Sequence, residues 1–279
     1  MSEKWLLRMV LPAVLLVVLS TGCRRQPVGS DERKVAVTAS WLECALQDVC
    51  GDAFETVRLC PPGSCPGHFD MKPSQLAAVR ECALMVRFDF QRGLDAKVGR
   101  RDQGGPRVAA LTVGEGLCVP ETYLVACREL AAEVSASCPD LEERCERGLV
   151  ETAARLEALT EEVRRRINEA GLVDRKVLSA SHQAAFARWL GLDVVATFEG
   201  GDDMTPQALA DAIRRADEAG VSFVVANLQQ GDRQARALAG RLGARVVVFS
   251  NFPAMSTSEA TFDGLLRANL DRLLEAAAK

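Results

Sequence analysis

The sequence predicts an α/β protein of two lobes, each a mostly parallel sheet flanked by helices, joined by one long backbone helix. Short β-rich runs alternate with amphipathic helical runs along most of the chain, which is typical of parallel α/β architecture. One long charged stretch, residues 140–170, interrupts this alternation, and all ten cysteines lie before residue 146. The chain is long enough to bury a core in each of two modest domains.

The first lobe is expected at residues 34–147. Its apolar runs predict strands. Two of its helices are expected to begin at Pro73 and Pro120, because proline lacks an N–H group and the N–H of a first helical residue has no partner within the helix. The expected order is strand 34–40, helix 41–51, strand 55–60, helix 73–82, strand 84–89, strand 107–113 and helix 120–137.

The charged stretch predicts the linking helix, at residues 148–171. Its apolar residues recur every three or four positions, which gives one buried stripe. Gly148 inside the stretch favours a helix packed along the body over a coiled coil. The stripe consists of Leu149, Ala153, Leu156, Leu159, Val163 and Ile167.

The second lobe is expected at residues 172–279, where the alternation is more regular and helices end at glycines. In open α/β sheets, ligands bind beyond the carboxyl ends of the strands. The expected order is strand 176–181, helix 182–191, strand 193–198, helix 206–220, strand 221–227, helix 232–243, strand 245–250 and helix 261–279.

The N-terminus predicts export. Residues 1–23 combine an early positive charge, a short apolar run and small residues before Cys23, which is typical of a lipoprotein signal with lipid added at Cys23. Ordinary secretion and an uncleaved anchor are the alternatives. Residues 24–33 would form a polar tether, so the protein is expected in the periplasm or on the cell surface.

The net charge bears on possible binding partners, and the cysteine content bears on possible disulfide bonds. A net charge of −4 gives no electrostatic footprint for nucleic acid. Export makes disulfides the default for the nine remaining cysteines, and the odd number leaves at least one thiol unpaired unless an intermolecular bridge forms. Cys60–Cys65 and Cys138–Cys145 are plausible local pairs, although connectivity does not follow from sequence.

Two histidines stand out because the chain has no others. His68 lies in a Pro/Gly/Cys loop, PPGSCPGHFD, and His182 follows the predicted strand 176–181. Imidazole is the commonest metal ligand in proteins, so the pair suggests a metal site. The alternative is one histidine at a helix cap and the other in a core.

Several segments resemble the zinc/manganese-type solute-binding proteins of ABC importers. The match includes PGHFDMKPSQLAAVRECALMVRFDFQRGLD, SHQAAFARWLGL, GGDDMTPQALADAI, LQQGDRQARALAGRLGARVVVF and TFDGLLRANLDRLLEA, in the family's order. The resemblance implies two α/β lobes linked by a rigid helix, a transition metal bound between them, and a membrane permease as partner.

Carried over residue by residue, the resemblance assigns His182 directly and His68 with a shift of one position. The family's second N-lobe histidine is absent, and that stretch offers Glu115 and Cys118 instead. The family's final carboxylate is also absent, and Ser250 and Asn251 stand there.

The expected ligands are therefore His68, His182, Cys118 and Glu115, with zinc as the metal and manganese or copper as alternatives. Cys118 is equally open to a disulfide with Cys127. Possible outer-shell partners are Gln229, Asn251 and Trp41. Asp202 and Asp203 are expected to cap a helix.

The leading hypothesis is a non-enzymatic, lipid-anchored receptor that delivers zinc to a permease. A second keeps the fold but binds a metal chelate or a haem-like cofactor. A third is a cysteine-dependent enzyme that uses Cys118 as its nucleophile.

Overall fold

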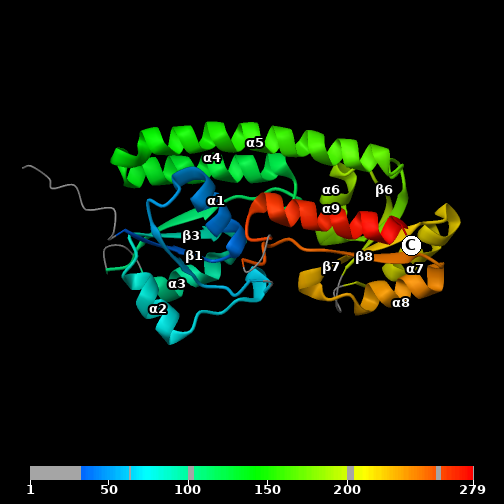
Figure 1. The fold of residues 1–279 in the computed structure, drawn as a ribbon. Helices are drawn as coiled ribbons and strands as arrows, with labels where there is room; N and C mark the ends of the chain where they lie inside the picture. The colour runs from blue at the N-terminus through cyan, green and yellow to red at the C-terminus, as the bar shows by residue number, and fades with distance from the viewer. Residues whose placement is uncertain (1–32, 63, 100–103, 200–203, 256–258, 279) are drawn as a thin grey trace, which may run out of the picture.

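The computed structural model describes residues 33–62, 64–99, 104–199, 204–255 and 259–278, and two lobes lie side by side beneath one long helix (Figure 1). This helix, α5, runs from Glu142 to Glu169. The predicted signal, Cys23, the tether and the Asp202–Asp203 pair lie outside the described residues. Within those ranges, no helix is both long and apolar enough to span a membrane.

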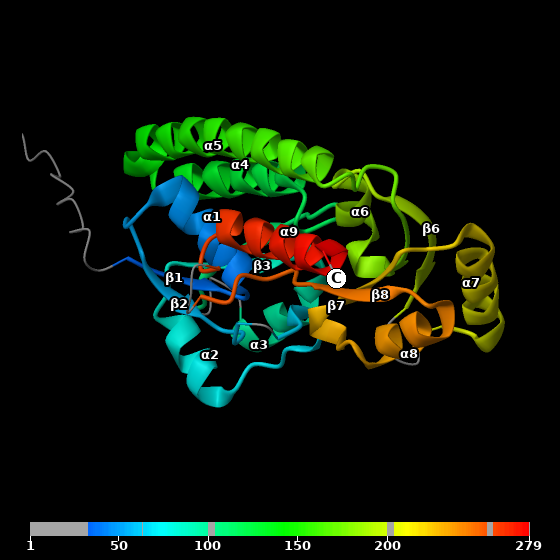
Figure 2. The same ribbon diagram turned by 45° about the vertical axis from the view of Figure 1, so that its right-hand side comes forward.

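The N-terminal lobe is a parallel sheet in the order β2-β1-β3-β4. Helices α1, α4 and α5 cover one face, and α2 and α3 cover the other (Figures 1 and 2). The bounds are β1 Lys34–Val37, α1 Ser40–Cys50, β2 Glu55–Arg58, α2 Pro73–Arg80, β3 Leu84–Phe88, α3 Asp95–Val98, β4 Arg107–Leu111 and α4 Pro120–Ser137.

The C-terminal lobe repeats this topology in the order β6-β5-β7-β8, again all parallel. Helices α6 and α9 lie on the side of α5, and α7 and α8 lie on the opposite face (Figure 1). The bounds are β5 Lys176–Ala180, α6 Ser181–Trp189, β6 Asp193–Phe198, α7 Pro206–Ala219, β7 Phe223–Asn227, α8 Arg233–Leu242, β8 Arg245–Phe249 and α9 Phe262–Ala278. The predicted two-lobed α/β class is confirmed.

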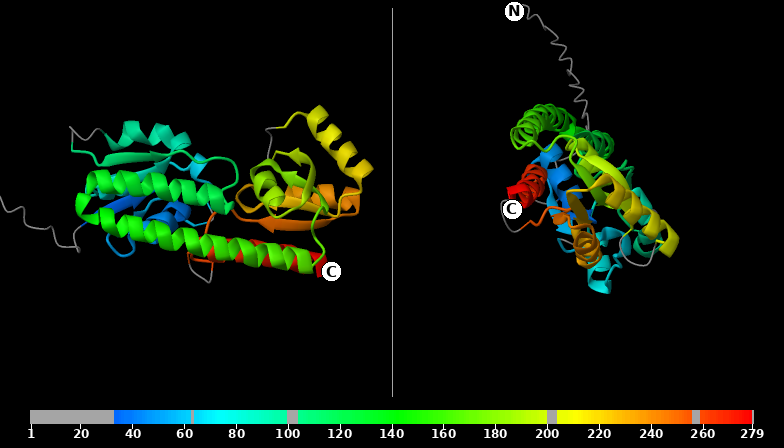
Figure 3. Two further views of the ribbon diagram at one scale, coloured as in Figure 1. Left: turned by 90° about the horizontal axis from the view of Figure 1, so that it is seen from above. Right: turned by 90° about the vertical axis from the view of Figure 1, so that its right-hand side faces the viewer.

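One hydrophobic core runs through both lobes on the side of α5. It includes Trp41 on α1, Leu130 on α4, Leu159 on α5, Phe186 on α6 and Leu265 on α9. Two smaller clusters fill the opposite faces, one under α2 and α3 and the other under α7 and α8. Seen from above, α5 lies along both lobes (Figure 3). The lobes therefore share buried apolar surface, and separating them would expose it to water.

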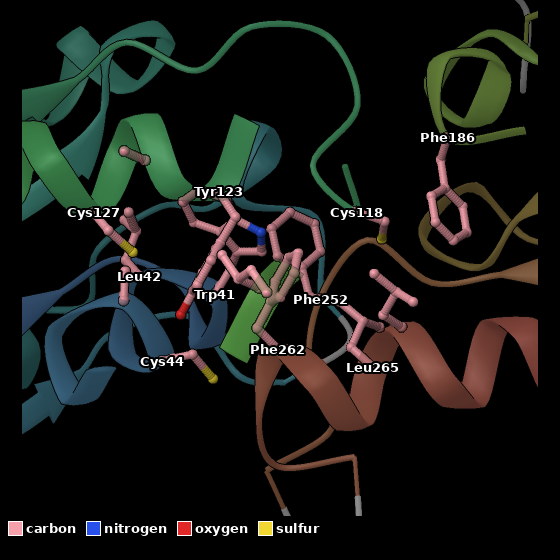
Figure 4. Close-up of a cluster of buried hydrophobic side chains, with 14 of the residues drawn as sticks. Trp41, Leu42, Cys44, Cys118, Tyr123, Cys127, Phe186, Phe252, Phe262 and Leu265 are labelled. Carbon is pink, nitrogen blue, oxygen red and sulfur yellow. The ribbon is translucent and has the colours of Figure 1, made fainter. Parts of the chain in front are cut away.

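The connection from β8 to α9 also joins the lobes, because its described parts pack against the N-terminal lobe. The Ser40 hydroxyl donates to the Pro253 carbonyl at 2.8 Å. The Phe262 ring stacks on Tyr123 with ring centroids 3.9 Å apart (Figure 4). The two lobes are thus connected twice, through α5 and through the segment between β8 and α9.

Helix α5 packs on α1 through an unusually close backbone contact. A Cβ atom at Gly148 would lie 2.3 Å from the Val49 carbonyl oxygen, so only glycine fits there. Farther along α5, Arg155 forms ion pairs with Asp48 of α1 and with Asp263 of α9. The predicted stripe is the packed face of α5, with Leu156, Leu159, Val163 and Ile167 buried and Leu149 and Ala153 partly buried.

The cysteine pairing predicted from local spacing is not found. No two of the nine cysteines among the described residues are bonded to one another in this structure. Cys60 lies with its sulfur 4.0 Å from the Ser64 carbonyl oxygen, and the Cys145 sulfur lies 3.8 Å from that of Cys50 rather than against Cys138. The reason is that Cys145 sits on the buried face of α5, which packs on α1, whereas Cys138 ends α4 and is half-buried.

Candidate functional site

A pocket of about 450 Å³ opens between the lobes at the carboxyl ends of their strands. The loop after β4 forms its N-terminal wall. The start of α6, the end of β6 and the second residue after β8 form its C-terminal wall. The polar and charged lining consists of Glu115, Ser181, His182, Arg188, Thr197, Glu199 and Asn251.

His182 enters this pocket because β5 ends at Ala180 and α6 begins at once. Its side chain is exposed, as a ligand that must meet an ion from solvent requires. The next residue, Gln183, is fully buried and points into the lobe. Its amide nitrogen donates to Asn251 Oδ1 at 3.0 Å and to Asn227 Oδ1 at 3.2 Å. Gln183 therefore fixes the first turn of α6, and with it His182.

The opposite wall is the loop of residues 112–119, which carries Glu115. Gly116 adopts a left-handed φ of +83° there, and a Cβ atom on it would lie 3.0 Å from Ala185 Cβ on α6. The N-terminal lobe thus touches α6 directly beside His182. The indole nitrogen of Trp41 donates to the Leu117 carbonyl at 2.8 Å. Trp41 is completely buried, so it supports this loop from behind.

Cys118 lies at the end of the same loop but does not line the pocket, and its side chain belongs to the shared core (Figure 4). It is 1% exposed, its thiol donates to the Ser250 carbonyl at 3.0 Å, and Asn269 Nδ2 donates to its sulfur at 3.5 Å. Burial raises the pKa of the thiol well above its usual value. This placement argues against Cys118 as a thiolate ligand or a nucleophile, since both need an accessible thiolate. The alternative disulfide with Cys127 is not present, because the Cys118 sulfur contacts Ser250 and Asn269 instead.

The loop after β8 is held by polar contacts where the family pattern has a carboxylate. Gln229 accepts from the Asn251 N–H at 3.0 Å and donates to Ser250 Oγ at 3.1 Å. Gln229 therefore orients the backbone of this loop, whereas the sequence suggested a bond to an imidazole. Asn251 itself lines the pocket, and its side chain is tied to Gln183.

His68 ends a short 3-10 turn, η2, at Pro66–His68. This turn packs against a second one, η3, at Asp89–Leu94. The Gln91 amide donates to the Pro66 carbonyl at 2.9 Å, and its oxygen accepts from the Thr38 hydroxyl at 2.6 Å. The turn is thereby anchored over the ends of β1 and β3. The His68 side chain lies outside the described part of the structure.

Glu199 is the pocket residue that the sequence reasoning missed. It directly follows β6 and is half-buried. The available signal was its place after a strand, the same signal that drew attention to His182. Among the described residues, no three His, Cys, Asp or Glu side chains stand close enough together to hold a metal ion. His182, Glu115 and Glu199 share one pocket without converging on one point.

Comparison with known families decides the relationship of the chain. A family model described as zinc-uptake complex component A, periplasmic, matches residues 35–276. The chain belongs to this family. It is therefore a solute-binding component of a metal-uptake system rather than an enzyme, and membership implies an exported, periplasmic location. The resemblance predicted from the sequence motifs is confirmed, and the hypothesis of a cysteine-dependent enzyme is wrong.

Solved structures of the same fold bind several metals. A crystal structure of ZnuA is 22% identical, with a TM-score of 0.72 over 88% of this chain and 100% of that one. The Cd-bound periplasmic metal-binding protein from Candidatus Liberibacter asiaticus is 13% identical, with a TM-score of 0.75 over 88% and 99%. The solute-binding protein FpvC of Pseudomonas aeruginosa, in complex with Mn²⁺, is 16% identical, with a TM-score of 0.70 over 88% and 99%. A search of curated protein sequences gave no significant match.

Proposed function

We propose that the protein is a lipid-anchored receptor that captures a zinc ion between its lobes and delivers it to the permease of an ABC importer. The observation that carries the proposal is His182, an exposed imidazole in an inter-lobe pocket that also contains two glutamates, in a chain of the zinc-uptake family. The proposed ligands are His182, His68, Glu115 and Glu199.

This donor set suits zinc, which accepts imidazole nitrogen and carboxylate oxygen in a four-coordinate site. Removing Cys118 from the set weakens the argument for copper(I), which favours thiolate. Adding Glu199 leaves manganese as the main competitor, because carboxylates are ligands that it prefers. Competition between zinc and manganese for the purified protein therefore decides the metal.

Metal capture on this proposal requires a small local movement. The glutamates and His182 do not yet meet, and the shared core resists a large rotation of the lobes. A shift of the loop that carries Glu115, at its contact with α6, is the smallest change that brings donors from both lobes onto one ion. Binding would then order this loop more than it reorients the lobes.

Calorimetry with zinc tests the proposed ligands. His182→Ala and His68→Ala are expected to weaken binding at least tenfold each, and Glu115→Gln and Glu199→Gln somewhat less. Glu151→Gln is the matched control, because Glu151 is an exposed glutamate on α5 outside the pocket. Thermal melting of each variant without metal checks its fold. Undiminished zinc affinity in the His68/His182 double variant would refute the proposal.

A metal chelate is a second candidate cargo, favoured by the size and charge of the pocket. A volume of about 450 Å³ exceeds the needs of a bare ion and falls in the range of small-molecule sites. Arg188, which cannot ligate a cation, lines the same pocket and suits a carboxylate of a chelator. Native mass spectrometry distinguishes the two, since a chelate adds an organic mass that zinc alone does not, and a haem-like ligand would also absorb visible light.

The anchor and the permease are the remaining parts of the proposal. Cys23→Ser is expected to move the protein from the membrane fraction to the soluble extracytoplasmic fraction, because no lipid can then be attached. If the variant stays with the membrane, an uncleaved signal anchor is favoured instead.

Delivery to a permease is tested by zinc uptake in cells that lack the chain and are complemented with it or with His182→Ala.

A further inference from the structure

We propose that Cys50 and Cys145 form a disulfide bond that fastens α1 to the backbone helix α5 in the exported protein. Their sulfur atoms lie 3.8 Å apart and both side chains are completely or almost completely buried. The two residues are separated by 95 positions, so the contact depends on the fold.

The surrounding packing brings the two helices close enough for such a bond. Gly148 lies one turn beyond Cys145 on the same face of α5, next to the Val49 and Asp48 carbonyls of α1. Helix axes about 8–10 Å apart bring facing Cα atoms, each about 2.3 Å from its own axis, within the roughly 7 Å that a disulfide requires. The missing side chain at Gly148 permits this approach beside Cys50.

The positive charge of Arg144, next to Cys145 in the chain, favours disulfide formation. Arg144 precedes Cys145 and forms an ion pair with Asp52, just beyond the end of α1. The two thiols share a hydrogen bond in which either sulfur could donate, and donation by Cys50, with the nearby charge of Arg144, lowers the pKa of Cys145. With this direction of the hydrogen bond, Cys145 is the attacking sulfur of the pair.

The other described cysteines do not offer an equivalent sulfur–sulfur contact. Cys44, Cys82 and Cys118 each donate to a backbone carbonyl instead, those of Ala260, Ala78 and Ser250. The Cys50–Cys145 contact thus differs from the pairs that sequence spacing suggests, Cys60–Cys65, Cys138–Cys145 and Cys118–Cys127, whose members lie close together in the chain.

The oxidant is a disulfide, RS–SR, either of a thiol–disulfide exchange protein or of a small thiol. The Cys145 thiolate attacks one sulfur, a Cys145–SR bond forms and RS⁻ leaves. The Cys50 sulfur, after losing its proton, attacks the Cys145 sulfur, so the protein disulfide forms and a second RS⁻ leaves. The two released protons convert both leaving groups to RSH. Because both sulfurs are buried in the folded chain, exchange takes place as α1 docks on α5 during folding.

Peptide mapping of the full chain recovered from its exported location tests the proposal. The protein is unfolded without reductant, its free thiols are blocked with N-ethylmaleimide, and it is digested. The expected result is one linked peptide pair containing Cys50 and Cys145. Maleimide on both residues, or Cys145 linked to Cys138, would overturn the proposal. This measurement does not depend on zinc binding, so its result tests the disulfide separately from the proposed function.

Stability provides the second measurement. Protein refolded with oxidised glutathione is expected to melt roughly 10 °C higher than protein refolded with reduced glutathione, because the bridge closes a loop of nearly 100 residues. Cys50→Ser should abolish this difference. Cys82→Ser is the matched control, a buried thiol that donates to the Ala78 carbonyl, and should retain it. A difference that survives in Cys50→Ser would refute the bridge.

Discussion

Gly148→Ala is expected to destabilise the protein, because α5 rests on α1 at this position without a side chain between them. The new Cβ would lie 2.3 Å from the Val49 oxygen and 2.8 Å from the Asp48 oxygen. An ordinary contact of about 3.4 Å then requires the two helices to part by about 1 Å. A backbone oxygen has no rotamer to change, so the cost lies near the upper end of the range for overpacking, about 3 kcal/mol.

Alanine also favours the helix over glycine by about 1 kcal/mol, which leaves a net loss of about 2 kcal/mol in the free energy of unfolding. Urea unfolding followed by circular dichroism measures this loss, in reducing buffer so that no disulfide contributes. Gly240→Ala in α8 is the matched control, because no described atom lies within 4 Å of a Cβ built there. The control is expected to gain up to about 1 kcal/mol. A Gly148→Ala variant as stable as the parent would show that the close approach of α1 and α5 is wrong.

Three further predictions follow from the contacts around the pocket and the long helix. Trp41→Phe keeps a buried ring but removes the hydrogen bond to the Leu117 carbonyl, and calorimetry should show a roughly fivefold loss of zinc affinity. Iodoacetamide at neutral pH should leave Cys118 unmodified in the folded protein and alkylate it after unfolding, because burial raises its pKa. Labelling of the native protein would place this thiol at the surface. A hydrogen bond from Arg267 lowers the pKa of Glu162, so their contact stabilises the protein above the ordinary carboxyl pKa and is lost as the pH falls through the folded value. Glu162→Gln should therefore cost up to about 1 kcal/mol at neutral pH and nothing in acid, since the pair is partly exposed. A loss that persists in acid would rule out the ion pair as its cause.

Most of the fold could be predicted because local patterns and tertiary structure agree. The helices at Pro73, Pro120 and Pro206 begin at the predicted residue, since proline suits the first helical position. The long helix begins at Glu142 rather than 148, because a 3-10 turn at Pro139–Leu141 leads into it directly. Elements as short as α3, with four residues, have no periodicity to detect.

The segment from Asp89 to Val98 shows what local patterns miss. The Gln91 side chain holds its first turn by bonds to Thr38 and Pro66, which come from two other parts of the chain. The stability of this segment therefore depends on tertiary contacts rather than on its own residues. Sequence periodicity carries no information about such contacts.

The site was predictable only in part for a related reason. His182 could be found because a histidine directly after a strand is both rare and suitably placed. Cys118 could not be assigned, since a cysteine serves equally as a ligand and as a small buried apolar residue. Its position became clear from the contact with Ser250, which lies 132 positions away. Glu199 required knowledge of which strand ends face the other lobe.

The arrangement of fixed and adjustable parts explains how one frame can serve metal capture. The shared core, the Arg155 ion pairs and the Phe262–Tyr123 stack hold the two sheets together, so a wide hinge opening would break all three. In the pocket wall that carries Glu115, Gly114 and Glu115 are exposed, whereas Leu117 is held by Trp41 and Cys118 is buried in the core, so only the tip of this loop is free of such contacts. On the proposed function, metal binding and release would therefore need the least rearrangement at the tip of this loop, while the rigid contacts elsewhere would hold His182 in place.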